Sequence, residues 1–215
     1  MPYQNRVTPQ GALIATAARG MYTGNRGRLH SAGGQITRLY EVRRWIMCRL
    51  DYPKPTHTVM APQHYTHLFF LDEATALAAG HRPCSMCLHS RFKEFAAHWQ
   101  TVHPEAGKPA QPNVDTIDRR LHEERLTDAR HKRTYAALLD ELPDGAIVLL
   151  EPQDQPFLVL GQQLRAWTPQ GYTAAIARPA NQPVAVLTPP SIVAILAAGY
   201  RPSLHPSAAS ATNSS

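Results

Sequence analysis

The chain of 215 residues has few cysteines, a modest share of charged residues and no long apolar run. Three cysteines are too few, and odd in number, for a disulfide framework, so we expect free thiols or metal ligands. No apolar run approaches the ~20 residues of a membrane span, so no membrane partner is expected. The first ten residues, MPYQNRVTPQ, lack the basic and apolar segments of a secretory leader, which predicts a cytoplasmic protein.

Positive charge is concentrated in the first third of the chain. Residues 1–71 contain nine Lys and Arg against two acids, a net charge of +7, whereas residues 72–142 have ten against eleven and residues 143–215 three of each. Such a segment is typical of a surface that contacts nucleic-acid phosphates, although it can also serve only solubility. The candidate contacts are Arg26, Arg28, Arg43 and Arg44.

The N-terminal half is expected to combine short strands with two helices. Apolar alternation indicates one or two strands within residues 36–50 and a short strand at residues 65–71. A short helix should follow, capped by Asp72 and ended by Gly80. Residues 88–100 carry an apolar stripe at helical spacing, which predicts a core-facing helix. The stripe consists of Leu88, Phe92, Phe95 and Trp99.

Residues 114–142 have a helical pattern, and we expect two helices that meet near Thr127. Their mixed charges suit a solvated face, so we assign His122, Glu123 and Glu124 to that face rather than to acid–base chemistry. The residues expected to face inward are Ile117, Leu121, Tyr135, Leu138, Leu139 and Leu142.

The last part of the chain is β-rich. Five short apolar runs between residues 146 and 187 predict an antiparallel meander or small barrel, and a helix ended by Gly199 follows. The expected parts are a basic region at 1–103, a linker or long loop at 104–113, a helical segment with a β-rich unit at 114–200 and a disordered tail at 201–215.

The most specific motif is Pro83-Cys84-Ser85-Met86-Cys87. Two thiolates at C-x-x-C spacing can bind one tetrahedral Zn²⁺ with Zn–S bonds of ~2.3 Å. If the strand that Cys48 ends pairs with the strand around Phe69 and Phe70, Cys48 would lie beside this turn. A thioredoxin-type redox motif is disfavoured, because a Gly-ended helix precedes the motif where a strand is required.

These residues resemble the zinc-binding N-terminal domain of the bacterial adaptive-response (Ada) DNA repair proteins over residues 42–92. The shared order is Cys48, Phe69, Phe70, Ala78, Ala79, Gly80, Arg82, Pro83, Cys84 and Cys87. In that family four cysteinates bind Zn²⁺, and one of them accepts a methyl group from a DNA phosphotriester. The resemblance implies that Cys48 matches the acceptor and that Cys84 and Cys87 match two further ligands. It also implies DNA rather than RNA as the partner.

One position departs from the family pattern. Tyr52 stands where the family has its second cysteine, so His57, His81, His89 or a water molecule would complete the site. Three thiolates with a neutral fourth ligand give Zn²⁺ a net charge of −1 instead of −2, which makes the sulfur less nucleophilic. We therefore expect the zinc to be structural.

A zinc nucleobase deaminase is a weaker alternative. Such an enzyme needs a glutamate two residues after its first ligand to move protons. None of Cys48, His57, His64 and His67 has one.

The sequence thus predicts an α+β fold in which a zinc-hairpin-containing, Ada-like region at 1–103 precedes helices and a small antiparallel β unit. The expected function is that of a zinc-binding, nucleic-acid-associated protein. An alkyl-acceptor DNA repair protein that uses Cys48 is one alternative. The other is a structural or interaction protein with a degenerate metal site, and whether the chain is an enzyme stays open.

Overall fold

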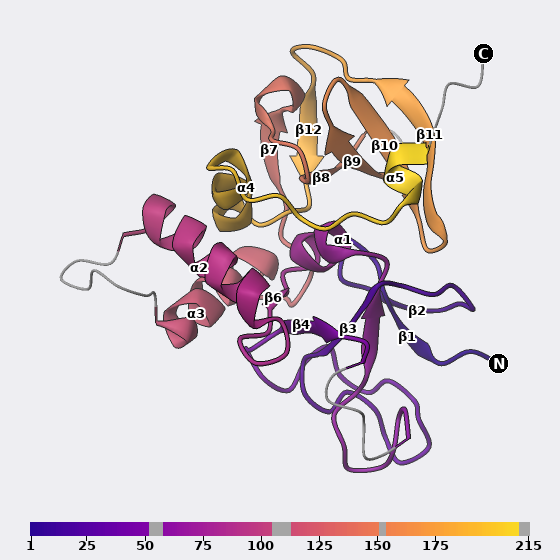
Figure 1. Cartoon of the computed structure of the whole chain (residues 1–215). Coiled ribbons are helices and arrows are strands. Elements are labelled where there is room, and N and C mark those ends of the chain that lie inside the picture. Colours follow the sequence, from indigo (N-terminus) through magenta and orange to yellow (C-terminus); the bar gives the residue numbers. More distant parts are fainter. Residues whose placement is uncertain (52–57, 105–112, 151–153, 211–215) are drawn as a thin grey trace.

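Two six-stranded sheets form the body of the chain (Figure 1). The computed structural model describes residues 1–51, 58–104, 113–150 and 154–210. The first sheet has the order β2-β1-β5-β3-β4-β6, in which the β1–β5 and β4–β6 pairs are parallel and the others antiparallel. Its strands are β1 (Gln4–Val7), β2 (Leu13–Ala15), β3 (Tyr22–Asn25), β4 (Ile46–Arg49), β5 (Leu68–Phe70) and β6 (Arg82–Pro83).

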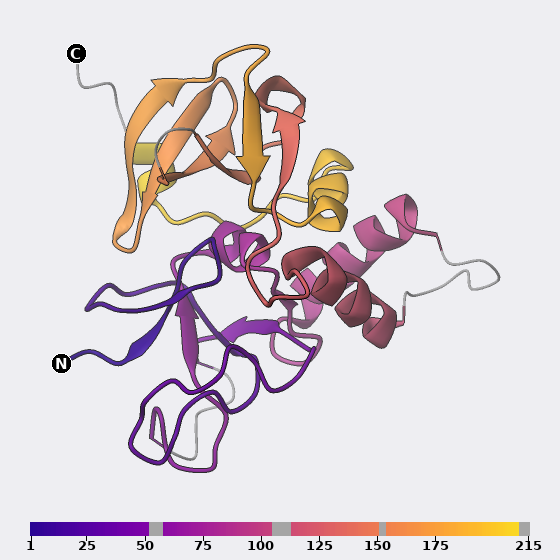
Figure 2. The ribbon, with the colours of Figure 1, turned by 180° about the vertical axis from the view of Figure 1, so that it is seen from behind.

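The second sheet is antiparallel, with the order β11-β10-β9-β8-β12-β7. Strands β8 to β11 form the expected meander, and β12 returns to the other side of β8. The sheet lies apart from the first one in Figure 2 and curves around its own inner face. Its strands are β7 (Tyr135–Leu138), β8 (Ile147–Leu149), β9 (Pro156–Leu160), β10 (Gln163–Thr168), β11 (Gly171–Ala177) and β12 (Pro183–Val186). The expected mixture of α and β elements with an antiparallel unit is confirmed.

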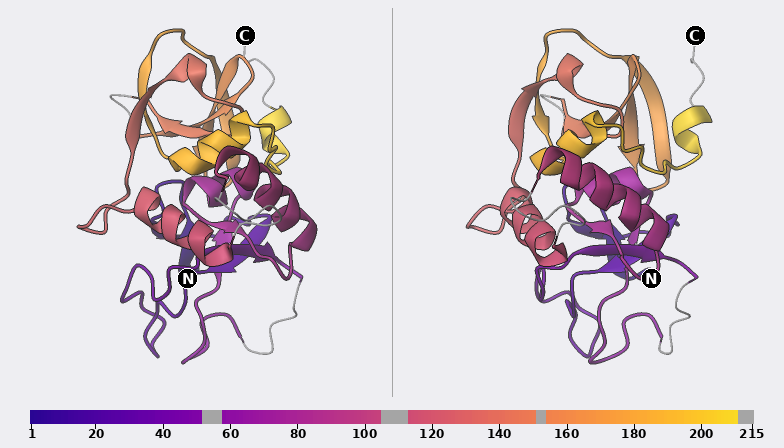
Figure 3. Two further views of the ribbon diagram at one scale, coloured as in Figure 1. Left: turned by 90° about the vertical axis from the view of Figure 1, so that its left-hand side faces the viewer. Right: turned by 60° about the vertical axis from the view of Figure 1, so that its left-hand side comes forward.

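One short helix, α1, lies between the two sheets, while three others gather on one side of the molecule (Figures 1 and 3). Helix α1 contacts β5 of the first sheet and β8 of the second, and α4 packs against both α2 and α3. No helix of the described ranges is both long and apolar enough to cross a bilayer. The helices are α1 (Glu73–Ala78), α2 (His89–Val102), α3 (Val114–Arg125), α4 (Pro190–Ala197) and α5 (Ser207–Ser210), with a 3-10 turn at Leu139–Glu141.

Helix α1 has the boundaries that the sequence indicates. The Asp72 carboxylate accepts a hydrogen bond from the Thr75 N–H at 2.9 Å, and Gly80 adopts a φ of +85° just after the helix. All six helical residues are buried. The apolar stripe of α2 is also confirmed as core, since its members from Leu88 to Trp99 are at most 9% exposed.

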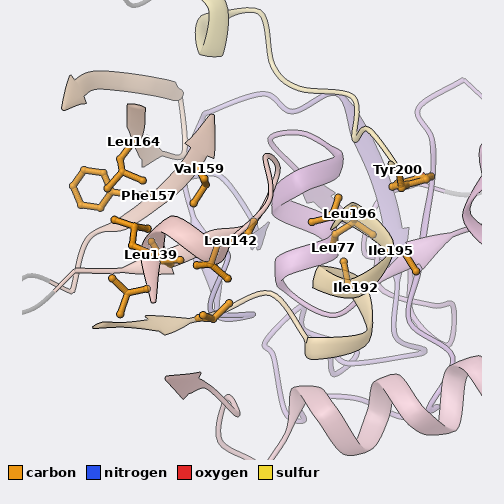
Figure 4. Packing of buried hydrophobic residues seen from close by; sticks show 14 of the residues in the cluster. Leu77, Leu139, Leu142, Phe157, Val159, Leu164, Ile192, Ile195, Leu196 and Tyr200 are labelled. Carbon is orange, nitrogen blue, oxygen red and sulfur yellow. The ribbon is translucent and has the colours of Figure 1, made fainter. Parts of the chain in front are cut away.

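Among the described residues, the hydrophobic core consists of three clusters, and α1 or its C-cap contributes to each of them. Leu77 belongs to the largest cluster, in which α2, α3 and α4 pack against the second sheet (Figure 4). Ala74 and Ala78 join the cluster that covers the other part of the second sheet. Ala76 and Ala79 join the cluster over the first sheet. The alanines therefore allow both sheets to approach one short helix closely.

The prediction of a second helix in the latter half of residues 114–142 is wrong. Residues 135–138 form strand β7, which pairs along its length with β12, and only α3 in the first half is helical. Of the residues expected to face inward, Leu138 is 37% exposed and Tyr135 is partly buried, because a strand turns alternate side chains inward. The other four are buried.

The prediction of one or two strands within residues 36–50 is confirmed by one strand, whereas the predicted disordered tail needs correction. Only β4 is a strand in the former segment, apart from a single bridge at Ile36. In the tail, residues 201–210 are placed against the body and end in α5. Most of the expected linker at 104–113 and the last five residues lie outside the described ranges.

Two buried carboxylates at the start of α1 hold the C-terminal segment. Asp72 Oδ2 accepts from the Tyr172 hydroxyl at 2.8 Å and from the His205 N–H at 3.1 Å. Glu73 accepts from the Tyr200 hydroxyl and from the Ser203 N–H. Burial raises the pKa of the Asp72 carboxyl, while these donors act in the opposite direction. Every acceptor bond here replaces hydration that burial has removed.

We expect Asp72→Ala to lower the free energy of unfolding by about 3 kcal/mol, because it removes a helix cap and leaves buried donors without an acceptor. Urea unfolding followed by circular dichroism measures the loss. The control is Asp128→Ala, at an exposed position, which should change stability by less than about 0.5 kcal/mol. Equal stability of the two variants would contradict the role given to Asp72.

Candidate metal centre

The register of the first sheet brings the three cysteines together. Strand β4 runs parallel to β6, with Met47 opposite Pro83. Cys84 follows directly, and its N–H donates to the Met47 carbonyl at 2.9 Å, which places it beside Cys48. The turn before α2 then brings Cys87 back to the same point. All three ligand atoms lie within 4.8 Å of one another.

Cys48 reaches this site by a different route from the expected one. Strand β3 lies between β4 and β5, so β4 does not pair with the strand around Phe69 and Phe70. The sequence hides β3 because it lies within a Gly/Arg tract that looks like a loop. Gly24 allows β3 to approach β4, since a Cβ atom there would stand 2.1 Å from the Ile46 carbonyl oxygen.

The donor set fits a soft, tetrahedral metal ion. The three cysteines are free thiols, with Cys84 buried and the other two partly buried. Sulfurs on a tetrahedral zinc ion with Zn–S bonds of ~2.3 Å stand about 3.8 Å apart, so a small inward movement would close the site. Thiolates favour Zn²⁺ over Mg²⁺ or Ca²⁺. The cluster can therefore bind a metal through three sulfur atoms.

Hydrogen bonds prepare the cluster for negative charge. The Cys48 thiol and the N–H groups of Met86 and Cys87 donate to Cys84, and these bonds lower the pKa of Cys84 to about 5. Donation to Cys84 and burial raise the pKa of Cys48, and burial raises that of Cys87. Cys84 is therefore the cysteine that loses its proton most easily, and a bound cation would favour loss of the other two protons.

No histidine joins the three cysteines within the described ranges. His81 is fully buried, where its Nε2 accepts from Arg26 and its ring packs on Trp45 and Phe70. His89 is exposed, and its Nδ1 lies 3.0 Å from the Ser85 carbonyl oxygen. His57 and Tyr52 lie outside the described residues. The prediction of His81 as a possible fourth ligand is therefore wrong, because its ring packs in the core instead.

A pocket of about 240 Å³ opens beside Cys48 and is a feature that the sequence did not reveal. Strands β3, β4 and β5 supply most of its wall, including Asn25 and Phe69, and the segment before β5 adds Tyr65 and His67. Burial and the sulfurs of Cys48 and Cys87 raise the pKa of the Tyr65 phenol. Cys48 is thus the cysteine through which the cluster meets this pocket.

The four candidate phosphate contacts do not form one surface. Arg26 is completely buried, and its guanidinium lies 3.9 Å from the Trp45 ring centroid, so its expected role at the surface is wrong. Arg28 is exposed but lies 3.8 Å from a Glu41 carboxylate oxygen. Arg43 and Arg44 are exposed on the segment before β4, and no ion pair within the described ranges includes either of them.

Comparison of the chain with protein-family models, curated proteins and solved structures finds no match in any of the three.

Proposed function

We propose that this chain binds one Zn²⁺ through Cys48, Cys84 and Cys87 and associates with nucleic acid, with the metal in a structural role. The observation that carries the metal part is the convergence within 4.8 Å of three thiols, one from strand β4 and two from the turn after β6. A zinc ion at this point ties β4 to the turn that starts α2. It thereby links the first sheet to the helical side of the molecule.

The nucleic-acid part rests on charge. The first 71 residues carry a net charge of +7, and Arg43 and Arg44 present two adjacent cations to solvent. Adjacent arginines of this kind contact phosphates without reading bases, so binding would be weak and nearly independent of sequence. The resemblance noted above favours DNA over RNA.

The pocket beside Cys48 favours a second candidate, an alkyl-acceptor repair activity. Cys48 borders the pocket, whereas neither Cys84 nor Cys87 is among its lining residues. In such a reaction Cys48 Sγ forms a bond to a methyl carbon while the C–O bond of a phosphotriester breaks, and the electron pair leaves on the phosphodiester oxygen. With only three sulfurs to load charge on the metal, we expect the structural role and no methyl transfer.

Purified protein should contain about one Zn²⁺ per chain by inductively coupled plasma mass spectrometry. Cys84→Ser should lose the metal and lower the melting temperature by about 10 °C, because a structural site contributes its binding free energy to folding. Ser85→Ala is the matched control in the same turn and should keep both. Protein that folds equally well with and without metal would remove the structural role.

DNA affinity should fall steeply as salt rises from about 50 to about 200 mM, because phosphate contacts release counterions. The double variant Arg43→Gln/Arg44→Gln should reduce the slope of log K against log salt by about two. The double variant keeps the hydrogen bond from Arg125 to residue 43, because the acceptor is the backbone carbonyl of Arg43. Lys93→Gln/Arg119→Gln removes equal charge from exposed positions of α2 and α3 and should change the slope little. Identical slopes for both variants would contradict this binding surface.

Incubation with methyl-phosphotriester DNA distinguishes a structural zinc from a zinc that activates Cys48 as a methyl acceptor. We expect no methyl adduct on the peptide that contains Cys48, measured by mass spectrometry of the zinc-loaded protein. A stoichiometric methyl group on Cys48, absent from Cys84 and Cys87 and prevented by a chelator, would instead establish the repair activity.

A further inference from the structure

Two buried cations and one partly buried cation lie together at the C-terminal end of α1. Arg26 follows β3, Arg125 ends α3, and Lys132 precedes β7. Arg26 and Arg125 are 0% and 1% exposed, and their guanidinium carbons lie 3.9 and 4.0 Å from the Trp45 ring centroid. Two chain segments thus bring positive charge to one indole ring, and Lys132 adds a third cation at the end of α1.

Neutral groups are the main partners of these cations. Lys132 Nζ donates to the Ala78 carbonyl, Arg125 Nη1 to the Gly80 carbonyl at 2.8 Å, and Arg26 Nη1 to the Gly11 carbonyl at 3.1 Å. The α1 C-terminus therefore supplies partial negative charge but no full counter-charge.

The Asp118 carboxylate, whose charge raises the pKa of Arg125, does not balance the group. Asp118 uses both oxygens on Arg82, at 2.8 Å each, and no ion pair of Arg26, Arg125 or Lys132 occurs within the described ranges. Buried charges without counter-charges are costly. The group thus carries an excess of positive charge that the described residues leave unneutralised.

A pocket of about 150 Å³ adjoins these cations. Arg125 and Lys132 line it together with Trp45 and Gly11, and exposed Arg130 stands at its rim. Arg26 lies behind Gly11, since a Cβ atom on that glycine would stand 3.7 Å from Arg26 Nη2.

Two donors at this place have no acceptor. Arg26 Nη2 and Arg125 Nε are buried and make no hydrogen bond within the described part of the chain. Native proteins rarely leave buried donors unused, and a bound ion is one of the partners that such donors have.

We propose that this pocket binds a phosphate-type oxyanion, either the free ion or the terminal phosphate of a monoester. Guanidinium and ammonium groups are the side chains that hold such oxyanions, and arginine presents several N–H donors to them. A neighbouring pocket of about 440 Å³, lined by Tyr40, His122 and Asp128, shares Leu126 and Arg130 with the first and offers room for the rest of a monoester.

Electrostatics supports the same assignment. Burial, with Arg26 and Arg125 adding repulsion, lowers the pKa of Lys132 to about 7, and burial lowers the pKa of Arg125 to about 9. A bound anion would favour the charged form of both side chains. The proposal is independent of the zinc site and of DNA binding, because the residues that line this pocket include neither the cysteines nor Arg43 and Arg44.

Thermal unfolding with inorganic phosphate tests this directly, with sodium chloride at matched ionic strength as the baseline. Wild-type protein should show a saturable rise in melting temperature, which reports binding to the folded state. Lys132→Met should weaken phosphate affinity about tenfold or more while folding in the absence of phosphate. Lys93→Met, a control with the same loss of charge at an exposed position of α2, should bind like wild type.

Arg130→Gln is a second test in case Lys132→Met does not fold. The Arg130 side chain lines the pocket but is exposed, so its replacement should leave the core intact. It too should weaken binding. A nucleoside 5′-monophosphate in place of phosphate distinguishes the two sources: tighter binding identifies a monoester, and equal binding identifies the free ion. The proposal is overturned if neither probe stabilises the wild type beyond sodium chloride, or if Lys132→Met and Arg130→Gln both respond like wild type.

Discussion

Complete burial of helix α1 is the constraint on which the rest of the structure depends. A six-residue helix cannot be stable alone, so it persists because both sheets cover it. Its alanines leave space for β5 on one side and β8 on the other. The helix therefore joins the two halves of the chain into one packed body. It also determines where β6, and with it Cys84, begins.

The charged side chains at the two ends of α1 have different kinds of hydrogen-bond partners. At the N-terminus, Asp72 and Glu73 accept from hydroxyl and N–H groups of the second sheet and the C-terminal segment. At the C-terminus, Arg125 and Lys132 meet carbonyl oxygens instead. Both arrangements agree with the helix dipole, but only the acids have a full set of donors. The imbalance at the cationic end is what makes a ligand there physically reasonable.

The thiol cluster depends on α1 indirectly. Gly80 ends the helix with a positive φ, the chain then enters β6, and the parallel pairing with β4 brings Cys84 to Cys48. The N–H groups of the following turn point at Cys84, so the backbone itself stabilises the first thiolate. A metal at this site would thus be held by strand register more than by the local motif. The pocket beside Cys48 arises from a different pairing, that of β3 with β4 and β5, because these three strands supply most of its wall.

The sequence by itself determined the elements whose signals are local. The cap at Asp72, the Gly80 and Gly199 endings, the apolar stripe of α2 and the meander from β8 to β11 all follow from short-range pattern. It also identified Cys84 and Cys87 as possible metal ligands, because C-x-x-C spacing lets both sulfurs reach one ion, while Cys48 was assigned to the same site from the family resemblance. Tertiary structure alone decided three other matters. Residues 135–138 became a strand because β12 offered them a partner, Arg26 entered the core because Trp45 and His81 receive it, and Cys48 reached its partners through β6. Each depends on contacts between residues far apart in the chain, and such contacts leave no periodicity that a single sequence can reveal.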